Sequence, residues 1–419
     1  MPHKTLAQAL EDSKVDMHQL EHEYGPLLTL VRALIGVVPN CDSYLEMWPP
    51  AFRTYNLLVP NALNLPQMLF GLGVRKDLVG LAMYAASRGA ECMYCSAHCC
   101  SFALRRGASV AAVQGQGAAA EQAVWNLAQA LGQMPPQLHQ GHVDALAMHL
   151  SADDREWILW GAALMGFLGK FMDTMGIELE PEAIADVQAI IGGTGWHPGK
   201  HLWNPESSPG LQAVPTDDFA LYVRVLRQMP AALRLQQRWS RGLGFTADSA
   251  LQALERAVGH GFHRLRMRKH QRPVIAVAAV LRDQLDPTTS TLGLMTKCLM
   301  GKIFAEFAAN DGLIEDMQIL LKVHSPELNE ALLQDVRTFA LNGSNDEAAL
   351  GSLPTMTRAA LLFAKRIAPS PAPLSADEIA EVTGALTPLQ IVEAVTWLAV
   401  LQMMHRLYTY DAVALAQAA

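Results

Sequence analysis

Charged residues are scarce in this chain of 419 residues: they make up 17% of it, whereas 51% of the residues are hydrophobic. A chain of this length and composition is expected to bury sizeable cores and has room for two domains. No apolar run reaches the roughly 18 uninterrupted residues that a membrane span requires. The closest run, 159–171, is short and contains Lys170. The first residues also lack the apolar stretch of a signal peptide. We therefore expect a cytoplasmic protein that does not enter a membrane.

Basic residues are fewer than acidic ones, with 32 Lys and Arg against 40 Asp and Glu. The formal net charge is −8, which argues against nucleic-acid binding as the main task. One basic run, 263–272, has no interleaved aromatic residues that could stack on bases, so we interpret it as a solvated or subunit-contact face. Neither Gly-x-Gly-x-x-Gly nor Gly-Lys-Ser/Thr occurs, and a nucleotide cofactor is not expected.

The alternating pattern of β-strands is absent, and apolar residues recur instead at spacings of three and four. An all-α fold is predicted. The expected helices lie at 25–37, 77–87, 95–106, 119–132, 155–175, 218–228, 246–262, 273–283, 292–309, 357–368 and 389–408.

The two halves of the chain resemble each other. Trp48 follows Pro39 by nine residues, as Trp239 follows Pro230. Farther on, each half continues with a helix, prolines, a short helix and a long apolar helix, for which Ser151 and Thr387 are the expected N-caps. A repeat of roughly 190 to 205 residues indicates that one helical domain has been duplicated.

We therefore divide the chain into five segments. The linker between the two domains is rich in Gly, Pro, Trp and His, and its 195–201 stretch is interpreted as a connection pinned by Trp196, with a lid over the site as the alternative. The segments are an N-terminal extension (1–24), a first domain (25–191), the linker (192–216), a degenerate second domain (217–410) and a tail (411–419).

Only six cysteines are present, yet four of them lie between positions 92 and 100. This clustering indicates one local site rather than a disulfide framework. Cys92, Cys95 and His98 follow one another at intervals of three, so on a helix they project from one stripe. A helix N-terminus at the first cysteine would favour the thiolate.

These three residues form a complete set for reducing a peroxide. His98 can take the proton of Cys95, the Cys95 thiolate can attack, and Cys92 can resolve the product as a disulfide. Three other interpretations remain open. They are a zinc site completed by Cys99 or Cys100, a buried cluster of inert thiols, and a redox sensor that forms the disulfide without turnover.

The second half lacks this set. Aligned by the cysteine helix, Cys298 corresponds to Cys92, but Gly301 and Phe304 stand where Cys95 and His98 would be. We expect Cys298 to be a buried small hydrophobic residue.

The stretch from Glu91 to Gly107 resembles the alkyl hydroperoxidase D and carboxymuconolactone decarboxylase superfamily. Peroxidase-related members carry Cys-x-Tyr-Cys-x-x-His-His followed by a helix that ends in glycine. Here the motif reads Cys92-Met93-Tyr94-Cys95-Ser96-Ala97-His98-Cys99. The resemblance covers roughly 25–190, and 215–410 only through the degenerate repeat. It implies two tandem helical domains of this type, a thiol-dependent peroxidase activity on an organic hydroperoxide, and a homo-oligomer. It implies no cofactor beyond the dithiol, but an external dithiol electron donor.

The chain departs from the family at two positions. The family places a histidine where Cys99 stands and a glutamate where Gly80 stands. Asp77 and Glu91 are the candidates to replace that carboxylate, and Cys99 is a candidate accessory thiol. Superfamily members that act on lactones generally lack the cysteine pair, so a decarboxylase-like lyase ranks below the peroxidase.

Overall fold

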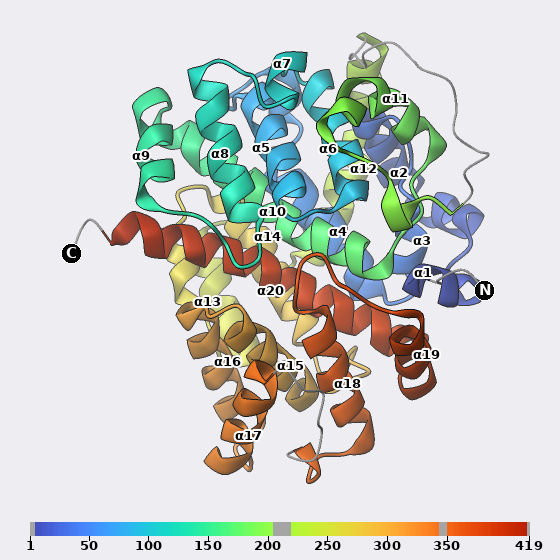
Figure 1. The fold of residues 1–419 in the computed structure, drawn as a ribbon, viewed down its shortest axis with the longest axis vertical. Coiled ribbons are helices and arrows are strands. Elements are labelled where there is room, and N and C mark those ends of the chain that lie inside the picture. Colours follow the sequence, from blue (N-terminus) through green and yellow to red (C-terminus); the bar gives the residue numbers. More distant parts are fainter. Residues whose placement is uncertain (1–4, 204–218, 343–349, 417–419) are drawn as a thin grey trace.

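The computed structural model describes residues 5–203, 219–342 and 350–416. Every secondary-structure element in these ranges is a helix, which confirms the all-α class. Helices α5–α9 and α11 form one part of the molecule, and α13 and α15–α19 form another. The long helix α20 crosses between these two parts (Figure 1).

Within residues 5–203, the first half contains eleven α-helices. The second of them runs through the predicted boundary at position 24, with a non-helical backbone at Tyr24. The bounds are α1 Leu6–Ala9, α2 Met17–Ile35, α3 Cys41–Leu45, α4 Pro49–Ala62, α5 Lys76–Gly89, α6 Met93–Arg105, α7 Val110–Val113, α8 Ala119–Gly132, α9 Gln140–His149, α10 Ala152–Met175 and α11 Pro181–Ile191.

The second half has a similar series, and its last helix extends past the predicted tail boundary at 410. Part of the predicted linker, 204–216, lies outside the described residues. The bounds are α12 Phe219–Trp239, α13 Ala247–Val258, α14 Gln271–Gln284, α15 Leu294–Phe307, α16 Asp311–His324, α17 Glu330–Leu341, α18 Thr355–Ile367, α19 Ala376–Ala385 and α20 Pro388–Leu415.

The ends of the two halves correspond in element order and length. Helices α8, α9 and α10 have 14, 10 and 24 residues, and α18, α19 and α20 have 13, 10 and 28. The two predicted N-caps are confirmed: Ser151 accepts a hydrogen bond from the Asp154 amide, and Thr387 accepts one from the Gln390 amide.

Helices α10 and α20 pack against each other at the centre. A Cβ atom on Gly166 would lie 2.8 Å from the Gln402 carbonyl oxygen, so this crossing requires a glycine. Arg406 of α20 donates to the Ala162 and Gly132 carbonyls at 2.8 and 3.1 Å. One continuous hydrophobic core therefore includes residues of both halves.

Lys170 ties the long helix of the first half to the second half. Its fully buried Nζ donates to the carbonyls of Ile367, Ala368 and Pro369, at 2.8, 2.9 and 2.6 Å. These are carbonyls at the C-terminus of α18, where a helix lacks internal donors and favours a cation. Burial lowers the pKa of Lys170 to about 7, against the attraction of Asp173.

Within the described ranges, we find no single helix that combines the length and apolarity of a membrane span. The pair α19 and α20 meets both criteria together, but it is bent by 114°.

Candidate active site around Cys92 and Cys95

The cysteine motif forms the first turn of α6, and Cys92 is its N-cap. The Cys92 backbone is extended (φ −83°, ψ 100°), and its Sγ accepts a hydrogen bond from the Cys95 amide at 3.3 Å. Glu91, just before it, adopts the left-handed region (φ 54°). The chain therefore turns sharply into the helix, and the Cys92 sulfur lies where exposed amides favour negative charge.

Cys95 and His98 line a cavity, and Cys92 lies outside its lining. Its walls are mainly aliphatic and come from α2, α4, α5, α6 and α10. The volume open to the centre of a water molecule is about 80 Å³. Cys92 is 1% exposed, close to Gly169 of α10. The helix thus presents Cys95 to the cavity and holds Cys92 behind it.

His98 pairs with a carboxylate that the sequence analysis did not single out. Its Nε2 lies 2.8 Å from Oε2 of Glu180, the N-cap residue of α11. The other carboxylate oxygen, Oε1, accepts from the Tyr94 hydroxyl at 2.9 Å and from the Asn40 amide at 2.6 Å. All the polar atoms of this buried carboxylate therefore have partners, as a buried charge requires.

The charge on Glu180 is held by these partners. Burial alone would raise its pKa, but the attraction of His98 and the hydrogen bonds that the carboxylate accepts outweigh burial and hold the pKa below its usual range. Glu180 is accordingly an anion at neutral pH, and it can stabilise a positive charge on the His98 ring.

The electrostatics of Cys95 act in the opposite direction. Burial raises the pKa of its thiol well above the usual value, and the hydrogen bond to Cys92 and the nearby sulfur atoms and Asp173 raise it further. Cys95 is therefore a neutral thiol at rest. The thiolate must form by transfer of its proton to a neighbouring base.

Two candidate carboxylates from the sequence lie elsewhere. Asp77 forms a bidentate ion pair with Arg75, at 2.8 and 3.1 Å, and Glu91 is exposed at the turn before α6. At the position of the family glutamate, a Cβ on Gly80 would lie 2.8 Å from the Ala103 Cα. No side chain fits between α5 and α6 at that point, and the carboxylate that contacts His98 is Glu180.

The remaining thiols of the cluster are divided between two faces of α6. Cys99 lines the cavity with its Sγ 3.6 Å from Met165 Sδ, and burial raises its pKa to about 12. Cys100 does not line the cavity, and burial raises its pKa as well. Within the described part of the chain, no group of three or more His, Cys, Asp or Glu residues has the geometry to hold a metal ion.

A second carboxyl group in this region was also missed. Asp42 of α3 is 1% exposed, and neither of its oxygens has a hydrogen-bond partner among the described residues. Burial, followed by the repulsion of Glu180 and Glu46, raises its pKa to about 8. Asp42 is therefore largely protonated at neutral pH, beside an acid that is ionised.

The described part of the predicted linker packs on α6. The Trp196 indole donates to the Met93 carbonyl at 3.1 Å, in the first turn of α6. His201 is buried and its Nδ1 lies 2.7 Å from the Ile177 carbonyl oxygen. Trp196 thus helps to fix the turn that carries the dithiol.

The structure corrects one residue match between the halves. Cys298 lies inside α15, in the core, whereas Cys92 caps a helix. The equivalent cap is Asn310 of α16, whose Oδ1 accepts from the Leu313 amide at 3.0 Å, after a left-handed Ala309 (φ 47°). Asn310 rather than Cys298 is therefore the residue comparable with Cys92, because both are N-caps that follow a left-handed residue.

Comparison with known proteins returned no match to any family model, curated protein or solved structure.

Proposed function

We propose that this chain is a thiol-dependent peroxidase that reduces an organic hydroperoxide through a cycle of Cys92 and Cys95 between dithiol and disulfide. The observation that carries the proposal is the division of roles around the cavity. Cys95 and His98 line the cavity, and Cys92 lies one helical turn away behind Cys95.

The proposed reaction balances within the site. With Nε2 of His98 bound to Glu180, the Nδ1 atom takes the proton of Cys95. The thiolate attacks the terminal oxygen of the hydroperoxide, the O–O bond breaks, and the proton from His98 converts the leaving alkoxide to an alcohol. The resulting sulfenic acid on Cys95 reacts with the Cys92 thiol, which forms the disulfide and releases water. An external dithiol donor then reduces the disulfide.

The second half contributes charge to this site. Burial lowers the pKa of Arg406 in α20 to about 10, and this fall is opposed by the electrostatic attraction of Cys95 and Cys92. We infer that this cation stabilises the Cys95 thiolate once it forms. The proposed chemistry of the first half therefore involves a positively charged side chain of the second half.

The proposal extends to the fold. We infer two copies of one helical unit that resembles alkyl hydroperoxidase D, with the second copy lacking the thiols. Its Asp316, at the position of His98 by cap geometry, pairs with His260 at 2.7 Å and accepts from Tyr408 at 2.8 Å. The second copy retains a buried carboxylate–imidazole pair but has a leucine where Cys95 would be. By the same resemblance we propose a cytoplasmic homo-oligomer.

The test is a thiol count on the fully reduced protein before and after one equivalent of cumene hydroperoxide. We expect the parent to lose two thiols rapidly, and Cys95→Ser to lose none. Cys298→Ser is the matched control, because this buried cysteine lies in α15 of the other half. Unchanged thiol loss in Cys95→Ser would contradict the proposal.

A redox sensor is the second candidate, and the raised pKa of Cys95 favours it because a neutral thiol reacts slowly. Turnover separates the two functions. With excess dithiothreitol as electron donor, an enzyme consumes many equivalents of hydroperoxide per chain, whereas a sensor that depends on a specific partner consumes only one.

A further inference from the structure

We propose that the cavity at the dithiol is one chamber of a two-chamber site for a linear, long-chain alkyl hydroperoxide. The second chamber, between α2, α4 and α12, holds the far end of the chain. This inference rests on the proposed function for its reaction, but it concerns which substrate class the site accepts.

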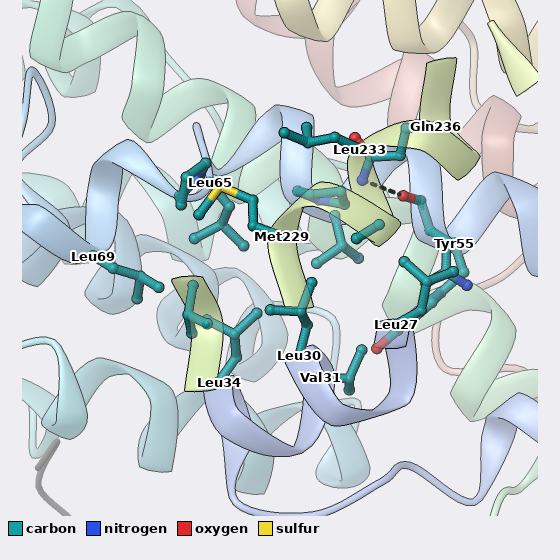
Figure 2. Close-up of a pocket in the computed structure, with 16 residues that line it drawn as sticks. Leu27, Leu30, Val31, Leu34, Tyr55, Leu65, Leu69, Met229, Leu233 and Gln236 are labelled. Atoms are coloured by element: carbon teal, nitrogen blue, oxygen red, sulfur yellow. Dashed lines mark hydrogen bonds between the residues drawn. The ribbon is translucent and has the colours of Figure 1, made fainter. Parts of the chain in front are cut away.

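The second chamber lies directly beside the first. Figure 2 shows its lining, with Leu27, Leu30 and Met229 among the side chains around it. The centre of a water-sized sphere can move through about 70 Å³ of this chamber, compared with about 80 Å³ of the first. Four residues line both chambers and form the partition between them: Val31, Leu34, Tyr55 and Val59.

The chemistry of the two chambers differs. All the reactive groups, Cys95, His98 and Cys99, lie in the first chamber. The second has no charged residue in its lining. Its two side-chain amides donate to backbone carbonyls, Gln236 Nε2 to that of Asn56 at 3.3 Å and Asn56 Nδ2 to that of Phe52 at 3.0 Å. A hydrocarbon chain therefore suits the second chamber, and a polar head that carries the peroxide suits the first.

The arrangement predicts a dependence on chain length. A compact branched hydroperoxide fills only the first chamber. Each methylene of a linear chain that passes the partition is removed from water, and the affinity should rise about fourfold per methylene until the second chamber is full. Leu233, which lines the second chamber, is 38% exposed, so the chamber borders the surface on the α12 side.

Binding of unreactive alcohols tests the chambers without the chemistry. Linear 1-alkanols from four to twelve carbons are titrated into full-length Cys95→Ser protein by calorimetry. We expect the dissociation constant to fall about fourfold per methylene over the middle of the series and then to level off. A dissociation constant that does not change with chain length would overturn the inference.

Substitutions in α12 test where the hydrocarbon chain of the ligand binds. Ala232→Phe places a ring in the second chamber and should abolish the gain from chain length, and Val225→Phe provides a second variant if the first does not fold. Leu226→Phe is the matched control, because Leu226 lies on the same helix, is 55% exposed and does not line the chamber. An unchanged chain-length series in both chamber variants, with native circular dichroism, contradicts the proposed location.

The hydroperoxide series separates this inference from the proposed function. Rates of thiol loss in the parent are compared between linear hydroperoxides and tert-butyl hydroperoxide. If the rate of thiol loss does not depend on chain length, the proposal that the second chamber binds the substrate is wrong, but the proposed peroxidase activity is unaffected. Chain-dependent alkanol binding without any thiol loss supports the chambers and overturns the peroxidase.

Discussion

Glu180 is the residue whose substitution best separates chemistry from folding. Its carboxylate pairs with His98 and also accepts hydrogen bonds from Tyr94 and the Asn40 amide. Glu180→Gln keeps the shape of the side chain but removes the negative charge. When His98 takes the proton of Cys95, the ring then becomes a cation with no anion beside it.

The size of the effect follows from these contacts. A positioned acid–base pair typically contributes about 10²- to 10⁴-fold to a rate, so we expect Glu180→Gln to slow thiol loss with cumene hydroperoxide by at least 100-fold. The lost hydrogen bond to a charged group costs stability as well, about 1.5–3 kcal/mol. This is a fraction of the 5–15 kcal/mol of an ordinary domain, so the variant should fold.

Asp186→Asn provides the matched control. Asp186 lies on the same helix, α11, and also ties it to α6, since it accepts from Ser101 Oγ at 2.9 Å and from Arg105 at 3.1 Å. Its substitution should lower stability by a similar amount but leave the rate within about threefold of the parent, because Asp186 does not contact His98. Rates and melting temperatures are measured on all three proteins. Equal rates in the parent and Glu180→Gln would refute the role assigned to this carboxylate.

Three further predictions concern pH and packing. Because burial holds the Cys95 pKa well above its usual value, alkylation of Cys95 by iodoacetamide should still accelerate above pH 9, and a rate that levels off by pH 7 would contradict the electrostatic account. The pKa of Asp42 is raised to about 8 in the folded protein, above its unfolded value of about 3.9, so this group destabilises the fold increasingly from about pH 4 to pH 8. By pH 7 the cost approaches about 4 kcal/mol as an upper limit. Asp42→Asn should therefore flatten the fall of melting temperature with rising pH, and an unchanged pH dependence would count against it. Gly166→Ala should cost about 1–3 kcal/mol, because its Cβ would meet the Gln402 backbone at 2.8 Å, whereas Gly384→Ala meets nothing within 4 Å and should raise stability slightly in urea unfolding.

The sequence was sufficient for the all-α class and for the helix that carries Cys95. Apolar periodicity and N-cap residues are local signals, and Ser151 and Thr387 cap the helices for which they were proposed. Helix α4 was not predicted from the sequence, because Pro49, Pro50 and Pro60 are typical of loops. In the structure the first two prolines occupy its first turn, and Pro60 lies inside it.

The partner of His98 could not be found in this way. Glu180 lies 82 residues away along the chain, and no spacing rule connects residues brought together only by packing. The one local signal was the Glu180-Pro181 pair, which marks a helix start. The match of Cys298 to Cys92 was wrong for a related reason: capping selects a side-chain acceptor, and asparagine serves as well as cysteine.

The contact between Lys170 and the end of α18 bears on how the molecule comes apart. Melting of the second half would remove the three carbonyls that accept hydrogen bonds from the buried Lys170 amine. The first half would then lose these buried hydrogen bonds together with part of its packing. The chain should therefore unfold in one cooperative transition. A calorimetric enthalpy equal to the van't Hoff enthalpy would mark the two halves as a single thermodynamic unit.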